Sequence, residues 1–290
     1  QKPKTYEFMG ELTNDDFVQS LEYTPGAGYP GQNMFGNPYT AAINIKKIVF
    51  GSNTDNSVYL YNTGTYNQWL DNSDNPYNEN TSAPGQFTVV PIGLAGLLGV
   101  PAQIPSMQGF LVNASSSGGS LSIPYSSVSK NTERQRAPGV NTTASTDKAG
   151  IRIDLFGRHY ADRMWIFSDP TFTAKYDNGW DGFKMLGSMQ TPQLYAMETD
   201  GNFQIDAVAD MNGTSLGFNA GQDTNFKLTF TTQNIKTIYS ALYLVDILAN
   251  KTVDITASGS EYEFTAASTP TPEKRFKIVT SPKVDTNIPQ

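Results

Sequence analysis

Apolar and polar residues alternate along four segments of the chain, at residues 151–155, 203–208, 226–230 and 262–264. In each segment every second side chain is apolar, so an extended strand would bury one face and expose the other. Shorter runs rich in β-branched or aromatic residues predict further strands, at residues 58–61, 110–112, 164–167, 242–245 and 276–279. The pattern predicts an all-β protein.

Asn-Gly or Asp-Gly pairs separate several of these segments and predict tight turns at residues 178–179, 181–182, 200–201 and 212–213. A glycine that follows Asn or Asp is typical of a turn position with positive φ. Many short strands joined by turns are typical of sandwiches and jelly rolls. We therefore expect two β-sandwich lobes of the jelly-roll kind.

Polar stretches suggest where the lobes divide. Residues 126–150 contain almost no large apolar side chain, which predicts a linker between a lobe at 1–148 and a lobe at 149–290. Residues 71–85 are rich in Asn, Asp and Pro, and predict an exposed loop within the first lobe. Residues 89–102 are apolar but shorter than the roughly 20 residues that span a bilayer. They predict a buried loop or short helical turn.

Short motifs along the chain carry a resemblance. In the first half they are GNPY at 36–39, IPSMQGFLV at 104–112 and LSIP at 121–124. In the second half they are YDNGWDGFKM at 176–185, PQLY at 192–195, LGFNAG at 216–221, LYLVD at 242–246 and RF at 275–276. In this order they resemble a module of secreted surface proteins of Bacteroidetes, over about residues 30–280.

The resemblance implies a β-rich module that lies late in large exported proteins. Such modules often precede a C-terminal sorting domain used by type IX secretion, whereas this sequence stops at Gln290 without one. The chain also begins at Gln1 without an initiator Met, so we expect an extracellular or cell-surface protein whose signal peptide has been removed.

The net charge and the absence of cysteine exclude several kinds of partner and site. The net charge is -7 and the isoelectric point is near 4.8, so nucleic acid and anionic membranes are not expected partners. The chain has no Cys, which excludes disulfides and thiolate metal sites.

Two motifs could point to catalysis. Residues 213–217 match the G-x-S-x-G pattern around Ser215, but a turn-rich segment follows where a hydrolase needs a helix. We therefore expect Ser215 to lie in a β-turn. His159 is the only histidine, and Asp154 and Asp162 flank it in sequence. A single histidine lacks the partners of a zinc site or a triad. We expect no catalytic residue and no enzyme activity, although the sequence leaves a pair of catalytic carboxylates open.

The segment at 177–182 places Asp177 and Asp181 in one tight loop, so calcium is a possible ligand there. The loop lacks the spacing of an EF-hand. We expect a structural turn whose glycines matter more than its carboxylates, and no cofactor.

Aromatic residues gather among polar ones in the first lobe. They are Tyr59, Tyr61, Tyr66, Trp69 and Tyr77. Exposed rings of this kind stack on sugars or dock a protein, while alternate rings on a strand pack inward. We expect a non-catalytic, adhesion-like or structural surface module with a protein or glycan partner. The alternative function is a carbohydrate-binding module that uses these five aromatic residues.

Overall fold

Strands dominate the computed structural model, which describes residue 7 and residues 9–62, 86–132, 147–186, 190–267 and 272–283. Within these residues the only helical elements are two 3₁₀ turns, η1 (Ile45–Lys47) and η2 (Tyr125–Ser127), and the single-turn helix α2 (Ile235–Ile238). The predicted all-β class is confirmed.

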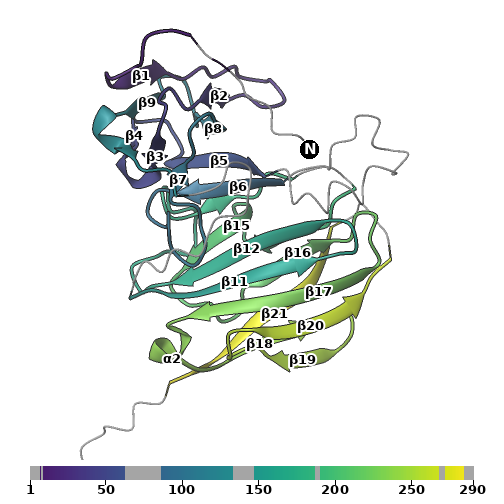
Figure 1. The fold of residues 1–290 in the computed structure, drawn as a ribbon. Coiled ribbons are helices and arrows are strands. Elements are labelled where there is room, and N and C mark those ends of the chain that lie inside the picture. The colour runs from purple at the N-terminus through teal and green to yellow at the C-terminus, as the bar shows by residue number, and fades with distance from the viewer. Residues whose placement is uncertain are drawn as a thin grey trace, which may run out of the picture.

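Three small sheets form from the first half of the chain, at the top of Figure 1. The first has the order β1-β9-β4, with β1 (Phe17–Ser20), β9 (Ser120–Ile123) and β4 (Val49–Phe50). The second has the order β10-β3-β7, with β10 (Val128–Ser129), β3 (Ala42–Asn44) and β7 (Gln103–Ile104). The third has the order β2-β8-β5-β6, with β2 (Gln32–Gly36), β8 (Gly109–Asn113), β5 (Ser57–Asn62) and β6 (Gln86–Pro91).

The second half of the chain forms one 11-stranded sheet with the order β19-β18-β21-β16-β14-β15-β12-β11-β17-β20, and β13 also pairs with β15. β12 and β15 run parallel, and the other pairs are antiparallel. The strands are β11 (Ala149–Phe156), β12 (Ala161–Ser168), β13 (Gly182–Phe183), β14 (Gln193–Met197), β15 (Asn202–Val208), β16 (Ser215–Asn219), β17 (Asn225–Gln233), β18 (Tyr239–Asp246), β19 (Lys251–Asp254), β20 (Ser260–Thr265) and β21 (Glu273–Pro282).

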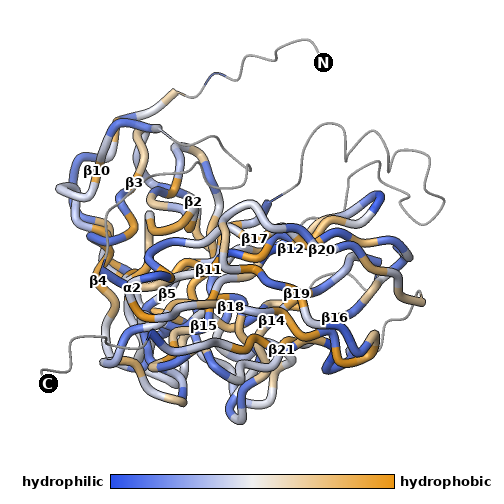
Figure 2. The backbone as a smooth tube through the Cα atoms, turned by 90° about the horizontal axis from the view of Figure 1, so that it is seen from below, coloured by the Kyte–Doolittle hydropathy of each residue, from blue (hydrophilic) through white to orange (hydrophobic). Residues whose placement is uncertain are grey.

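Alternation of apolar and polar residues builds the interior of the large sheet. In β17 the buried side chains are Phe226, Leu228 and Phe230, and in β20 they are Tyr262 and Phe264. Hydrophobic and hydrophilic residues alternate along many strands in Figure 2. The inward residues of several strands form one apolar core, as the period of two predicts.

The large sheet curls until its two ends approach each other. β20 ends the sheet at one side, yet the ring of Phe264 lies 5.2 Å from the ring of Phe276 in β21, near the opposite end. Phe218 of β16 lies 5.2 Å from Phe264 and 6.0 Å from Phe276. These edge-to-face contacts fill the space enclosed by the curled sheet.

A second apolar core lies under the small sheets and receives residues from both halves of the chain. It includes Trp165, Phe167 and Phe172 from the second half. The indole N–H of Trp165 donates to the carbonyl of Leu98, 3.0 Å away, and the backbone N–H of Val89 donates to the side chain of Gln204. The small sheets are built from residues before 148 and the large sheet from residues after it, but this core contains residues from both sides. The division into two lobes stays a prediction.

The motifs that carry the resemblance have structural roles. The side-chain N–H₂ of Asn37 donates to the carbonyls of Ala41, Ile104 and Pro105 over 2.9–3.1 Å. The hydroxyl of Tyr39 donates to the carbonyl of Ile123, 2.8 Å away. GNPY therefore ties together segments that are distant in sequence by satisfying buried carbonyl groups. Of residues 89–102, predicted to be a buried loop or short helical turn, 89–91 instead end strand β6. Residues 92–99 form a turn-rich loop with buried Leu94, Leu97 and Leu98.

Two of the four predicted glycine turns need a correction. Gly179 has φ +88° and Gly213 has φ +97°, which confirms the positive φ predicted there. Gly182 and Gly201 do not have positive φ. A Cβ atom on Gly182 would lie 2.4 Å from Val89, and one on Gly201 would lie 2.8 Å from Phe183. These two glycines are required by close packing, not by backbone conformation.

Alanine at these glycines should therefore destabilise the protein for two different reasons. Gly179→Ala should cost on the order of 1 kcal/mol because its φ disfavours a Cβ atom. Gly182→Ala should cost about 1–3 kcal/mol through collision with Val89. Gly28 has no atom within 4 Å of a built Cβ, so Gly28→Ala is the control. Urea unfolding of the three variants measures this, and equal midpoints for Gly182→Ala and Gly28→Ala would contradict it.

Candidate functional site

The predicted aromatic surface is only partly described. Tyr59 is 4% exposed and belongs to the core below the small sheets, so it is not the surface residue that the binding interpretation required. Tyr61, at the end of β5, is 38% exposed and packs 5.0 Å from the ring of Phe87. Tyr66, Trp69 and Tyr77 lie outside the described residues, and their role in binding stays a prediction.

The loop at 177–182 uses its carboxylates for backbone hydrogen bonds. The carboxylate of Asp181 accepts the backbone N–H groups of Asp177 and Ala207, both over 2.6 Å. Asp177 accepts the N–H and hydroxyl of Thr173 over 2.7 and 3.0 Å. Asn178 accepts the N–H of Asn56 and donates to the carbonyl of Thr54, so it joins this loop to the first half of the chain. These contacts give the loop a structural role.

A pair of buried carboxyl groups lies beside that loop. Burial, together with the nearby charges of Glu198, Asp181 and Asp200, raises the pKa of Asp206 to about 8. Burial also outweighs the two backbone hydrogen bonds of Asp181 and raises its pKa to about 7. The Oδ2 atom of Asp206 has no hydrogen-bond partner among the described residues. Both pKa values therefore lie near neutral pH, well above the ordinary value of an Asp side chain.

The catalytic candidates do not assemble into a site. His159 Nδ1 lies 2.8 Å from Asp223 Oδ1, and neither Asp154 nor Asp162 is its partner in that contact. Ser215 opens strand β16 opposite Lys277, so it lies in a strand and not in the turn that we expected. A nucleophile elbow needs a strand, a turn and a helix in succession.

Neither a metal site nor a membrane helix appears in the part of the chain that the structure describes. No three His, Cys, Asp or Glu side chains in that part gather as metal ligands. No helix there has the length and apolar character needed to cross a bilayer.

A buried network of charges joins the two ends of the curled sheet. Arg275 of β21 donates through Nε and Nη2 to Asp246 Oδ2 at the end of β18, over 3.2 and 2.9 Å. The hydroxyl of Tyr262 in β20 donates to the same oxygen over 3.0 Å. Arg275 Nη1 also donates to the carbonyl of Thr265. Burial by itself raises the pKa of Asp246, but the hydrogen bonds from Arg275, Ala249 and Tyr262 outweigh it and hold the pKa below its ordinary value.

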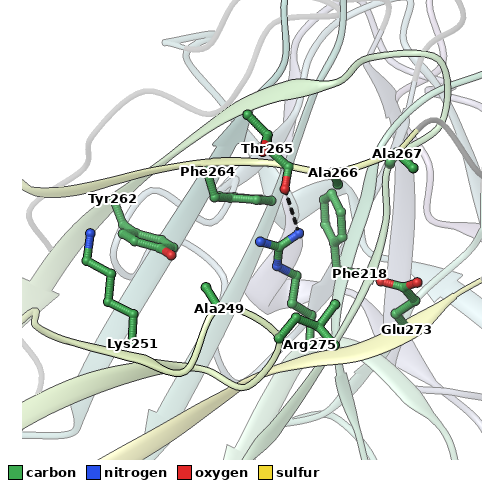
Figure 3. Close-up of a pocket in the computed structure, with 12 residues that line it drawn as sticks. Phe218, Ala249, Lys251, Tyr262, Phe264, Thr265, Ala266, Ala267, Glu273 and Arg275 are labelled. Carbon is green, nitrogen blue, oxygen red and sulfur yellow. Dashed lines mark hydrogen bonds between the residues drawn. The ribbon is translucent and has the colours of Figure 1, made fainter.

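Three members of this network, Tyr262, Thr265 and Arg275, line a pocket of about 580 Å³ (Figure 3). The guanidinium of Arg275 lies 4.2 Å from the ring centre of Phe264, and the ammonium of Lys251 lies 5.1 Å from that of Tyr262. Such cation–π contacts favour a fixed position for both cations. Glu273 and small side chains complete the lining. The pocket therefore offers aromatic walls and a cation that is already paired.

Sequence reasoning missed this network, although two of the resemblance motifs contain its partners. LYLVD ends at Asp246, and RF begins at Arg275. Asp246 follows Leu242 and Leu244 at the spacing of inward-facing residues, so its charge needs a buried partner. Arg275 follows Glu273 and Lys274 and gives no such signal. The sequence does not say which charges pair.

Comparison with known proteins places this all-β chain in a family. Residues 3–279 match the family model described as "Domain of unknown function (DUF8693)", and the chain belongs to that family. It is 36% identical over 276 residues to the Minor fimbrium subunit Mfa5 of Porphyromonas gingivalis, a member of the Bacteroidetes. That alignment covers 92% of this chain and 22% of the relative, so the chain spans about a fifth of the relative's length. No solved structure matches the chain.

The buried carboxyl pair should make stability fall as pH rises. The folded-state pKa of Asp206, about 8, lies above the roughly 3.9 of an unfolded Asp. The folded state therefore holds a proton that the unfolded state loses, and stability declines from about pH 4 to pH 8. The side-chain amide introduced by Asp206→Asn is neutral at every pH, so this variant should lose less stability over that range and gain at least about 1 kcal/mol at pH 8. Urea unfolding from pH 5 to pH 8 measures it, and parallel curves for parent and variant would refute the argument.

Removing Arg275 should destabilise the contact between the two ends of the large sheet. Arg275→Met leaves Asp246 buried without its cation, which should cost about 3–5 kcal/mol. Adding Asp246→Asn should recover part of that loss. Lys227→Met is the control, because Lys227 and Glu261 form an exposed pair that contributes less than about 1 kcal/mol. The midpoints of urea unfolding compare the variants, and similar losses for Arg275→Met and Lys227→Met would count against a structural role for the network.

Proposed function

We propose that this chain is a non-catalytic structural module of a fimbrium-associated protein on the bacterial surface. One observation carries the proposal: 36% identity to the Minor fimbrium subunit Mfa5 over 92% of the chain. Identity at this level over 92% of the chain supports a shared architecture. Its partners are then other proteins of the fimbrium or of the cell surface.

The chemistry of the described residues supports an architectural role. Each buried carboxylate described above, apart from Asp206, accepts hydrogen bonds that hold strands or loops in place. Asp246 joins β18, β20 and β21, and Asp181 joins the 177–182 loop to β15. Buried polar groups that are fully hydrogen-bonded make a fold more rigid, which is what an architectural role requires.

Surface display and export complete the proposal. The family resemblance of the sequence motifs and the fimbrial relative both favour an extracellular place on the cell. Export by the type IX route, with removal of a signal peptide, is the finer part of the proposal and rests on the motif resemblance alone.

A test of the function uses the native gene in its own organism. Sheared surface filaments and the remaining cell bodies are probed with an antibody against residues 149–290. We expect the protein in the filament fraction, and we expect deletion of the codons for residues 3–279 to remove it from that fraction. A second antibody, against a tag placed outside the module, follows the deleted protein. Recovery of the native protein only from the cytoplasm, or of the deleted protein at full level in the filaments, would overturn the proposal.

A further inference from the structure

A lysine and an aspartate in the large sheet are in direct contact and shielded from solvent. Lys184 Nζ donates to both carboxylate oxygens of Asp162, each over 2.6 Å. The side chains are 0% and 1% exposed. Asp162 lies near the start of β12, and Lys184 directly follows β13, so the two come from separate strands of the sheet.

A backbone N–H group also donates a hydrogen bond to the carboxylate of Asp162. The backbone N–H of Leu194, in β14, donates to Asp162 Oδ2 over 2.7 Å. A fixed backbone N–H on a carboxyl oxygen stabilises negative charge that develops there when a nucleophile attacks the carboxyl carbon. The three strand segments thus place an amine, a carboxyl group and an oxyanion donor together.

Two other lysine–carboxylate pairs in the described residues are more exposed to solvent. Lys148 and Asp169 have side chains 18% and 20% exposed, and Lys227 and Glu261 have side chains 40% and 50% exposed. In water a lysine stays a hydrated ammonium ion. In a dry site the separated charges are costly, and moving one proton from Nζ to the carboxylate gives a neutral amine and a neutral acid.

We propose that Lys184 and Asp162 join in an intramolecular isopeptide bond. The neutral Nζ attacks Cγ of the protonated carboxyl group, and the charge on the resulting oxyanion is held by the N–H of Leu194. The C–O bond to the departing hydroxyl breaks, and that hydroxyl takes a proton from the nitrogen and leaves as water. The products are one amide and one water, so no oxidant, reductant or co-substrate is needed. Fixed proximity in place of collision supplies much of the rate.

The bond would cross-link the sheet beside an irregular strand pairing. β12 and β15 pair in parallel, β13 pairs with β15 through a register shift, and the backbone N–H of Lys184 donates to the carbonyl of Asn202 just at the start of β15. A covalent bond from Lys184 to β12 would fix this short strand against the sheet. Such a cross-link acts on the unfolded chain as a disulfide does, by closing a loop.

Mass spectrometry of the purified 290-residue chain tests the proposal. The intact mass should be lower than that of the sequence by one water. Trypsin should fail to cut after Lys184 and should yield a branched peptide, in which residues 159–163 are attached to residues 176–227. Lys184→Met and Asp162→Ala should each have the full mass of their sequence. Lys227→Met, which alters the exposed pair, should still lack one water.

The peptide map distinguishes the isopeptide bond from other reactions that lower the mass. A succinimide at Asp181-Gly182 or Asp200-Gly201 also loses water but leaves Lys184 open to trypsin, and cyclisation of Gln1 loses ammonia. Water loss at those positions alone, or a parent with the full mass and with cleavage after Lys184, would overturn the proposal. If either substituted protein fails to fold, the parent's peptide map still decides.

Discussion

The structure depends on satisfying charges that the curled sheet encloses. An 11-stranded sheet that bends back on itself brings β20 against β18 and β21, and this seam has no ladder of backbone hydrogen bonds in the described strand order. Side chains make the closure instead. Asp246 accepts from Arg275 and Tyr262, and Arg275 reaches the carbonyl of Thr265. Removal of a carboxylate from water is costly, and the seam offsets that cost with several donors to one group.

The same solution recurs where other charges are buried. Asp154 accepts from Arg152 and Arg163, and Asp223 accepts from the ring and backbone of His159. Asp206 is the exception, since its Oδ2 lacks a partner in the described residues and its pKa is raised. A carboxyl group without donors lowers its cost by keeping its proton, whereas Asp246 keeps its charge because donors surround it. Donors alone do not decide the form, because Asp181 accepts two backbone N–H groups and its pKa is still raised to about 7. Asp246 differs in having the cation of Arg275 among its donors.

Sequence patterns predicted most of the strands, because burial of alternate side chains is a local property. The segments at 151–155 and 226–230 became β11 and β17. The same patterns failed for Tyr59 and Gly182, where the outcome depends on a neighbour from elsewhere in the chain. Tyr59 is buried by the core that both halves build, and Gly182 is required because Val89 approaches it. The Lys184–Asp162 pair was invisible for the same reason, since two residues 22 positions apart meet only after the sheet has formed.

Hydrogen bonds join the two halves of the chain. Asn178 binds the backbone of Thr54 and Asn56, Gln204 binds Val89, and Trp165 binds the carbonyl of Leu98. Each bond links the large sheet to the half that carries the small sheets. A substitution in one half therefore leaves a buried polar group of the other half without its partner, at a cost of about 1–3 kcal/mol. The family model likewise spans both halves, from residue 3 to residue 279.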